Sequence, residues 1–166
     1  MTLHTNNNSR ANALAERLEE GAKALTSFAE KLSGPDWQKP IPGGGRKIGV
    51  IVHHVASVYP VEIELAQTLA SGNPITGASK KVIDDMNATH AKENETVDKE
   101  ETLDLLKRNS RAAADAIRSF SDAELDNAAP VSLNANAPLT AQFFIEDHAL
   151  RHSFHHLAQL EDALNR

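Results

Sequence analysis

The sequence contains no cysteine. Disulfide bonds, thiolate metal ligands and a nucleophilic cysteine are therefore excluded. The redox compartment is left open by this absence, because a chain without thiols suits either side of a membrane. A metal site in this chain would have to rely on histidine or oxygen ligands.

Basic charge is also scarce, with 17 Lys and Arg residues against 23 Asp and Glu residues and a net charge of −6. The basic residues are scattered and form no stripe, which argues against binding to a nucleic-acid backbone. We interpret the acidic excess as a solvated surface that keeps a cytoplasmic protein soluble.

Long apolar runs are missing as well, since none approaches the roughly 18 residues of a membrane span. The first ten residues, MTLHTNNNSR, are polar and lack the apolar centre of a signal peptide. We therefore predict no membrane span and no signal peptide, and we expect residues 1–8 to be frayed or disordered.

Aromatic residues make up only 4% of the sequence. Ala and Leu dominate the apolar residues, which favours helices. Strand patterning is nearly absent, and Val131-Ser132-Leu133 is too short to found a sheet. The sequence of 166 residues predicts a single all-α domain spanning 1–166.

Apolar residues at three- and four-residue steps predict long helices separated by Gly-, Pro- and Asn-rich loops. Ser9 is the expected N-cap of the first helix, and Asp98 with Glu101 forms the expected capping box of the fourth. Long helices with modest loops predict an antiparallel helical bundle. The predicted helices are 9–32, 47–70, 78–93, 98–120 and 139 or 140–165, with a short turn at 121–125 and loops at 34–45 and 127–138.

Pro60 lies inside the second predicted helix, where it cannot donate a backbone hydrogen bond to the carbonyl of Ala56. We expect a kink after His54 rather than a break into two short helices. Trp37 is expected to cover one end of the bundle, and Tyr59 to be a core residue with its hydroxyl at the rim.

Four of the eight histidines lie in one nine-residue stretch inside the last predicted helix: His148, His152, His155 and His156. His152 and His156 are four residues apart, so their rings lie one above the other and can converge on one ion. This spacing is common in helical zinc sites, although chance pairs with the same spacing are frequent in His-rich helices.

A third imidazole comes from the second predicted helix. Helical steps from His54 reach Val50, Ile51 and Val58, the face expected to be buried, whereas His53 lies on a mixed face. Buried imidazoles without partners are costly, and one ion would satisfy three of them. We therefore predict a divalent metal, zinc or nickel, bound by His54, His152 and His156 with one position open.

Several other histidines and two acidic residues have candidate roles. His148 and His155 are candidates for proton transfer, and either could instead join His53 as an additional ligand or a partner of one. Glu62 and Asp147 are candidates to orient a ligand imidazole. His4 and His90 are predicted to be solvated and without partners. The alternative to a metal site is a plain helical bundle with histidines on its surface.

Three segments of the chain resemble the DinB/YfiT-like superfamily of proteins assigned as metal-dependent enzymes. Ile48-Gly-Val-Ile-Val-His-His54 is similar to the family's second helix and first ligand, and Ile83-Asp-Asp-Met-Asn87 to the opening of its third. His152-Ser-Phe-His-His156-Leu-Ala-Gln159 resembles the HxxxHxxQ signature of its last helix. The resemblance covers nearly the whole chain.

The resemblance implies an all-α four-helix bundle, antiparallel with one longer crossover and of up-down-down-up character, with the metal in a cavity at one end. It implies His54, His152 and His156 as the ligands and a small-molecule substrate, such as a low-molecular-weight thiol. The reactions implied are thiol S-transfer and thiol-dependent isomerisation, with hydrolysis of a small ester or amide as an alternative. A non-catalytic, metal-bearing binding module is a further alternative, and a homodimer through exposed helix faces fits each of them.

Overall fold

The structure is a computed structural model that describes residues 8–43 and 45–165. It is mainly helical with one short hairpin. In chain order the elements are α1 (Ser9–Glu30), α2 (Gly34–Gln38), α3 (Ile48–Ala70), α4 (Lys80–Glu93), α5 (Lys99–Arg118), α6 (Asp122–Asp126), β1 (Ala128–Val131), a 3₁₀ turn (Ser132–Asn134), β2 (Ala137–Thr140), α7 (Ala141–Phe144), a π-helical segment (Ile145–Leu150) and α8 (Arg151–Leu164).

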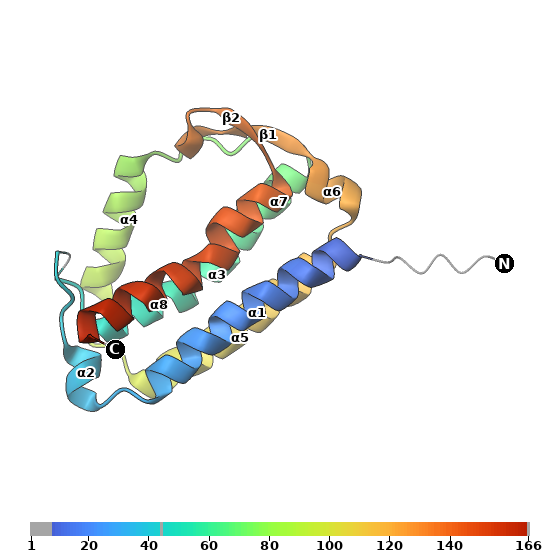
Figure 1. Cartoon of the computed structure of the whole chain (residues 1–166). Coiled ribbons are helices and arrows are strands. Elements are labelled where there is room, and N and C mark those ends of the chain that lie inside the picture. The colour runs from blue at the N-terminus through green and yellow to red at the C-terminus, as the bar shows by residue number, and fades with distance from the viewer. Residues whose placement is uncertain (1–7, 44, 166) are drawn as a thin grey trace.

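Four long helical rods form the bundle: α1, α3, α5 and the continuous rod from α7 to α8 (Figure 1). Helix α1 packs on α5 and α8, and α3 packs on the same two neighbours. The predicted all-α four-helix bundle is therefore confirmed. Helix α4 stands beside α3, outside the four rods (Figure 1).

Polar contacts fix the directions of the helices. Asn8, just before α1, donates to the carbonyl of Arg118 at the end of α5 over 3.2 Å, so α1 and α5 are antiparallel. The start of α3 lies near the start of α5, because Lys47 donates to the carbonyl of Glu95 over 3.1 Å. Helices α3 and α5 therefore run in the same direction, and residues 71–98, which include α4, form the longer crossover between them (Figure 1).

The observed helix ends lie close to the predicted ones. Asp98 accepts a hydrogen bond from the backbone of Glu101 over 2.9 Å, as expected of the N-cap of α5. Ser9 is the first residue of α1 rather than its N-cap, which is Asn8. The predicted fraying of residues 1–8 and the solvation of His4 concern residues outside the described part, apart from Asn8 itself.

Two predicted loops contain regular structure. In 34–45, Ser33 and Asp36 form a reciprocal capping box that starts the short helix α2. In 127–138, β1 and β2 pair as an antiparallel hairpin in the register Ala128↔Thr140, and Ile75 adds a parallel bridge to Val131. The expectation of loops alone was wrong because these elements depend on side-chain caps and on long-range pairing rather than on apolar periodicity.

Helix α3 continues unbroken through Pro60, so the alternative of two short helices is wrong. Proline removes the donor that would have served the carbonyl of Ala56. Asn109 on α5 replaces that donor, because its side-chain amide donates to the Ala56 carbonyl over 2.8 Å. A neighbouring helix therefore satisfies the backbone group that the proline leaves without a partner.

The last rod was predicted as one α-helix from residue 139 or 140, and Thr140 is indeed its N-cap. Six of its residues, Ile145–Leu150, are π-helical instead. This wider turn lies directly before α8, which carries His152 and His156. Segments of π-helix inside α-helices are frequent at functional sites.

Helix α3 is long and apolar enough to cross a membrane by length and composition, although its apolar residues form no uninterrupted run of that length. In the structure 61% of its most apolar 18-residue window is buried by the rest of the chain. Its hydrophobicity is therefore that of the central helix of the bundle.

Trp37 and Tyr59 show how closely the helices pack. The indole of Trp37 is buried against Gly49, where a Cβ atom would lie only 2.4 Å from the ring, and its Nε1 donates to the carbonyl of Val97 over 3.0 Å. Tyr59 is also buried, but its hydroxyl bonds to the buried Ser153 of α8. The expected position of this hydroxyl at the rim was therefore wrong.

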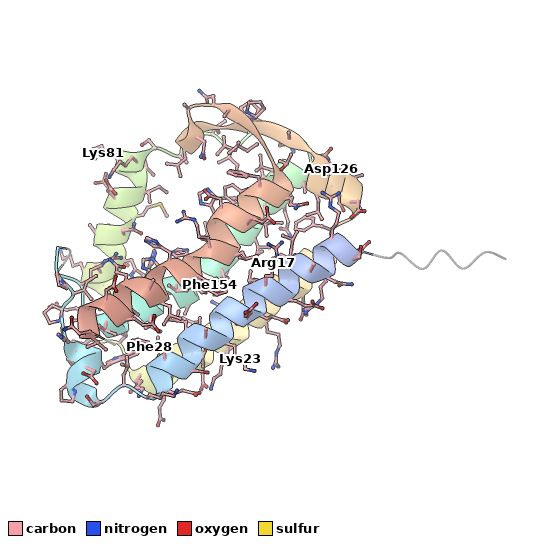
Figure 2. The ribbon with its side chains drawn as sticks, in the orientation of Figure 1. Arg17, Lys23, Phe28, Lys81, Asp126 and Phe154 are labelled. Carbon is pink, nitrogen blue, oxygen red and sulfur yellow. The ribbon has the colours of Figure 1, made fainter. Side chains whose placement is uncertain are left out.

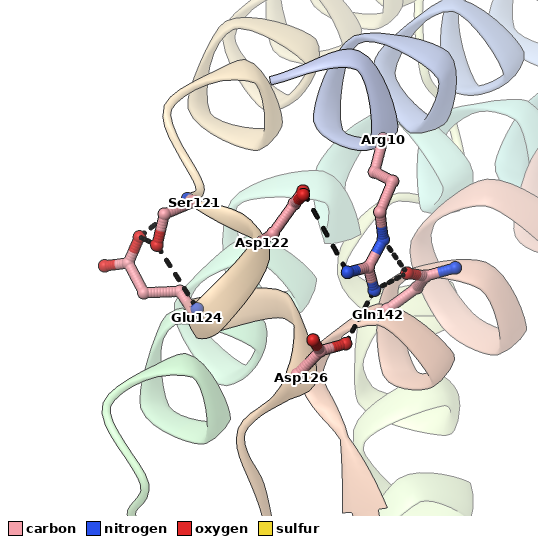
Figure 3. A network of polar contacts seen from close by, with 6 residues as sticks. All are labelled: Arg10, Ser121, Asp122, Glu124, Asp126 and Gln142. Carbon is pink, nitrogen blue, oxygen red and sulfur yellow. Dashed lines mark hydrogen bonds and ion pairs between the residues drawn. The ribbon is translucent and has the colours of Figure 1, made fainter. Parts of the chain in front are cut away.

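Further contacts join the rods at the surface. Phe154 projects from α8 towards α1, where Gly21 leaves room for its ring (Figure 2). At the start of α1, Arg10 contacts Asp126 over 2.7 Å and also Gln142, which links α1 to α6 and α7 (Figure 3). The exposed ion pair between Arg10 and Asp126 contributes little to the free energy of folding.

Candidate metal centre

The structure brings together the three histidines that the sequence singles out as ligands. His54 comes from the first third of α3, and His152 and His156 come from successive turns of α8. One potential ligand atom from each residue lies within 4.8 Å of the other two. Nε2 of His54 and Nε2 of His152 are 3.1 Å apart.

Two neighbouring side chains hold the α8 imidazoles through their other nitrogen. Nδ1 of His152 lies 2.7 Å from Oε1 of Glu62 on α3, and Nδ1 of His156 lies 3.0 Å from Oε1 of Gln159. Both oxygens accept, so each Nδ1 carries the hydrogen and each neutral ring keeps a lone pair on Nε2. Such partners fix the tautomer and the orientation of metal-binding imidazoles.

Burial keeps two of these rings uncharged. His54 and His156 are 6% and 7% exposed. Desolvation, with a smaller contribution from His152, lowers the pKa of His54 to about 2 and the pKa of His156 to about 3. Both rings are therefore neutral near pH 7, which is the form that ligates metals.

The donor set fits a divalent cation of borderline softness. Nitrogen ligands about 2.0–2.1 Å from a tetrahedral zinc ion lie about 3.3–3.4 Å from one another. The separations here, from 3.1 Å to no more than 4.8 Å, bracket that value. Without a cation, one ring would have to donate to the lone pair of another.

The two candidates for proton transfer occupy different positions. His148, in the π-helical segment, is mostly buried, stacks on Phe144 and has an Nε2 atom without a hydrogen-bond partner. Desolvation lowers the pKa of His148. His155 is exposed and its ring touches that of His156 edge-on.

Of the two acidic candidates, only Glu62 contacts a predicted ligand. Asp147 instead bonds to Arg151 over 3.2 Å and lies 3.7 Å from Nε2 of His148. The suggestion that Asp147 orients a ligand imidazole is therefore not supported by the contacts of its carboxylate.

His90 is not the solvated residue without a partner that the sequence predicts. It is half-buried, its Nε2 lies 2.9 Å from Nδ1 of His53, and its ring meets that of His54 edge-on. The polar sequence around α4 gave no hint of this, because the contact depends on the crossover that places α4 beside α3. Burial lowers the pKa of both His53 and His90.

A pocket of about 370 Å³ opens onto the three histidines. This volume suits a small organic molecule. His148 and His155 also reach it, and α3, α4 and the hairpin complete its walls. Most of the lining side chains are apolar, among them Val58, Leu65, Ile75, Ile83, Val131 and Phe144.

The sequence pattern that defines the DinB superfamily matches residues 17–160 of this chain. The chain belongs to the DinB superfamily. The match includes α3 and the part of α8 that carries the histidines, so it covers the whole candidate centre of this DinB protein. No curated protein sequence matches the chain.

Two solved structures share the fold. YfiT from Bacillus subtilis, described as a "probable metal-dependent hydrolase with an unusual four-helix bundle topology", has a TM-score of 0.74 at 17% identity; the match covers 100% of this chain and 92% of YfiT. A protein from Exiguobacterium sibiricum assigned to the DinB family has a TM-score of 0.60 at 18% identity, covering 93% of this chain and 89% of that one. At these sequence identities the likeness to the two solved structures shows only that this chain shares their fold.

Sequence reasoning named Gln159 only as part of the HxxxHxxQ signature, and it did not assign Arg46 to this site. Gln159 could have been recognised as a partner of His156, because a residue three positions on in a helix lies on the same face. Arg46 also lines the pocket, but it follows a glycine-rich turn, where no periodicity tells which way a side chain points.

Proposed function

We propose that this DinB protein is a metal-dependent enzyme that acts on a small molecule in the 370 Å³ pocket, by thiol S-transfer or thiol-dependent isomerisation. The observation that carries the proposal is the meeting of three imidazoles at the wall of a largely apolar pocket. Three protein ligands leave a coordination position open, as in catalytic sites.

His54, His152 and His156 would hold one divalent ion, zinc or nickel, through their Nε2 atoms. When bound, the ion supplies Lewis acidity that lowers the pKa of a water molecule or a thiol and so produces a nucleophile near neutral pH. Glu62 and Gln159 keep two of the imidazoles in the tautomer that this role requires.

His148 is the better placed proton acceptor. Among the described residues its Nε2 has no hydrogen-bond partner, and its lowered pKa keeps the ring neutral at neutral pH. In the tautomer that carries its hydrogen on Nδ1, the Nε2 atom has a free lone pair. It can therefore take the proton of a thiol or a water molecule that becomes the nucleophile. His155 is exposed and suits exchange of that proton with solvent. The apolar walls exclude bulk water from the reacting groups.

Hydrolysis of a small ester or amide is the second candidate. The description of the similar YfiT as a "probable metal-dependent hydrolase" favours it. The same residues serve both reactions, since they differ in whether a thiol or a water molecule loses its proton to His148. A metal-bearing binding module without turnover is the remaining alternative.

Metal analysis of the purified protein tests the first step. Protein prepared without a nickel column is expected to contain one divalent ion per chain, and His152→Ala is expected to lose it. His155→Ala is the matched control, because it removes an imidazole from the same helix outside the triad and should keep the ion. Full occupancy in His152→Ala would contradict the proposed ligand set.

Activity assays separate the candidate functions. The metal-loaded protein is tested for conjugating a small thiol to an electrophile and for hydrolysing p-nitrophenyl acetate. We expect the first activity to disappear on chelation, to return with metal and to be absent in His152→Ala. Ester hydrolysis alone would favour the second candidate, and no turnover in either assay would favour the binding module.

We also propose that the protein works in the cytoplasm as a homodimer, with small molecules rather than nucleic acid or membrane as partners. The acidic net charge argues against a nucleic-acid partner, and the burial of α3 in the bundle argues against a membrane partner. Exposed apolar side chains offer surfaces for a second copy, among them Val82, Met86 and Phe143. Light scattering at micromolar concentration would return the mass of two chains, and the mass of one chain would refute the dimer.

A further inference from the structure

Arg46 lies between the turn at Pro42–Gly43 and the start of α3, with its side chain half-buried. Its Nη1 atom is inaccessible to water. Within residues 8–43 and 45–165 this atom has no hydrogen-bond partner, and no carboxylate forms an ion pair with Arg46. Other arginines behave differently, since Arg10, Arg17 and Arg118 each pair with a carboxylate.

An unpaired cation in this position is costly for the fold. Desolvation lowers the pKa of Arg46. A guanidinium nevertheless stays protonated in proteins, so the side chain keeps its charge at neutral pH. Burying a charge without a partner is unfavourable, so a ligand of opposite charge would stabilise this partly buried side chain.

The guanidinium belongs to the candidate metal centre. Its positive charge contributes to the lowered pKa of His54, of His156 and of His90. Arg46 lines the same 370 Å³ pocket as the predicted ligands His54 and His156. A small molecule in the pocket can therefore reach the triad and Arg46 together.

The charges around the pocket would be unbalanced towards the positive with a divalent ion on the triad. Arg46 and Glu62 carry the formal charges of its lining, and Oε1 of Glu62 is already engaged by His152. A divalent ion on the triad would add two more positive charges. The remaining lining is mostly apolar, with imidazoles and one amide.

We propose that Arg46 binds the carboxylate of the substrate, and that the substrate is a small organic acid with an apolar body. This inference rests on the proposed function in one respect, namely that the ligand of Arg46 is the molecule that reacts at the triad. A single planar guanidinium matches a carboxylate through two parallel hydrogen bonds. The lining offers no lysine or second arginine, which a more highly charged phosphate would favour.

The test compares ligands that share an apolar body and differ in the head group. Metal-free protein is titrated calorimetrically with hexanoate and with hexan-1-ol. Metal is left out because a carboxylate could also ligate the ion. Hexanoate is expected to bind about tenfold more tightly than the alcohol or better, as charge-assisted hydrogen bonds give.

Variants connect this preference to Arg46. Arg46→Gln should bring the two affinities to within about twofold, and Arg46→Lys should keep part of the preference, because the charge remains while the fork is lost. Arg111→Gln is the matched control, since this exposed arginine of α5 lies outside the pocket and should keep the full preference.

An NMR readout in the wild-type protein does not depend on how well the variants fold. The side-chain Nε resonance of Arg46 should shift with hexanoate and stay in place with hexan-1-ol. Equal affinities in wild type, no binding of either ligand, or a preference that survives Arg46→Gln would each overturn the inference. Because the assay contains no metal, its failure is distinct from failure of the metal-binding proposal.

Discussion

At the scale of single residues, the candidate centre depends on which nitrogen of each imidazole carries its hydrogen. Glu62 and Gln159 make that choice for His152 and His156 through contacts of 2.7 and 3.0 Å with Nδ1. Glu62 is 8% exposed, and its Oε2 atom has no hydrogen-bond partner. Such a carboxylate is unfavourable for the fold alone, so its position is better explained by a ligand imidazole that becomes more positive when a metal binds.

Glu62→Gln should therefore weaken metal binding while leaving the fold in place. The amide still accepts from Nδ1 of His152, but it no longer offers a negative charge to the imidazole. Loss of such a partner typically lowers metal affinity by about 10–100-fold. Competition with a chromophoric zinc chelator measures the change. Glu64→Gln, an exposed neighbour on the same helix, is the control, and an equal loss in both variants would count against a role for Glu62.

At the scale of elements, α3 combines a proline with a long buried helix. The exposed Pro60 leaves the Ala56 carbonyl without its usual donor, and the half-buried Asn109 supplies another across the α3–α5 interface. The arrangement stabilises the part of α3 that follows His54 and precedes Glu62. It also explains how the helix that presents both residues can contain a proline without breaking.

A double-mutant cycle tests this account of α3. Asn109→Ala should lower the free energy of unfolding by about 1–2 kcal/mol, because a buried carbonyl loses its donor. In the Pro60→Ala background the new backbone N–H can serve Ala56, so the same substitution should cost clearly less. Urea unfolding of the four proteins gives the coupling energy. A cost that is the same in both backgrounds would show that Asn109 acts in another way.

The helices and strands also show which parts of the fold could be predicted from the sequence. Periodicity located the four rods and the inward face of His54, because burial of a continuous apolar stripe leaves a regular signal. The π-helical segment before α8 and the pairing of β1 with β2 left no such signal. The crossover places His90 beside His53, and the segment after a glycine-rich turn places Arg46 at the pocket. The paths of both segments depend on tertiary contacts, which the sequence pattern does not indicate.

At the scale of the whole molecule, burial of neutral imidazoles links stability to pH. The folded-state pKa values of His54 and His156, about 2 and about 3, lie below the usual value of 6.5. Below pH 6.5 the unfolded chain therefore binds more protons than the folded one, so stability is present above that pH and is lost as the pH falls. Burial shifts His53, His90 and His148 in the same direction.

The metal-free protein should accordingly lose about 2–3 kcal/mol of unfolding free energy between pH 7.5 and pH 5.5, counting His54 and His156 alone. Urea unfolding at the two pH values measures the loss. His156→Gln cannot take up a proton, so the variant should show a shallower dependence whatever its absolute stability. A wild-type profile that stays flat over this range would mean that the imidazoles are not buried as neutral groups.

The central claim is that imidazoles from two helices distant along the chain hold one ion. An anomalous-scattering map at the zinc edge, from crystals of protein loaded with one equivalent of zinc, tests it most directly. A single strong peak is expected about 2.0–2.1 Å from Nε2 of His54, His152 and His156. A peak at other residues, or none near the triad at full loading, would contradict it.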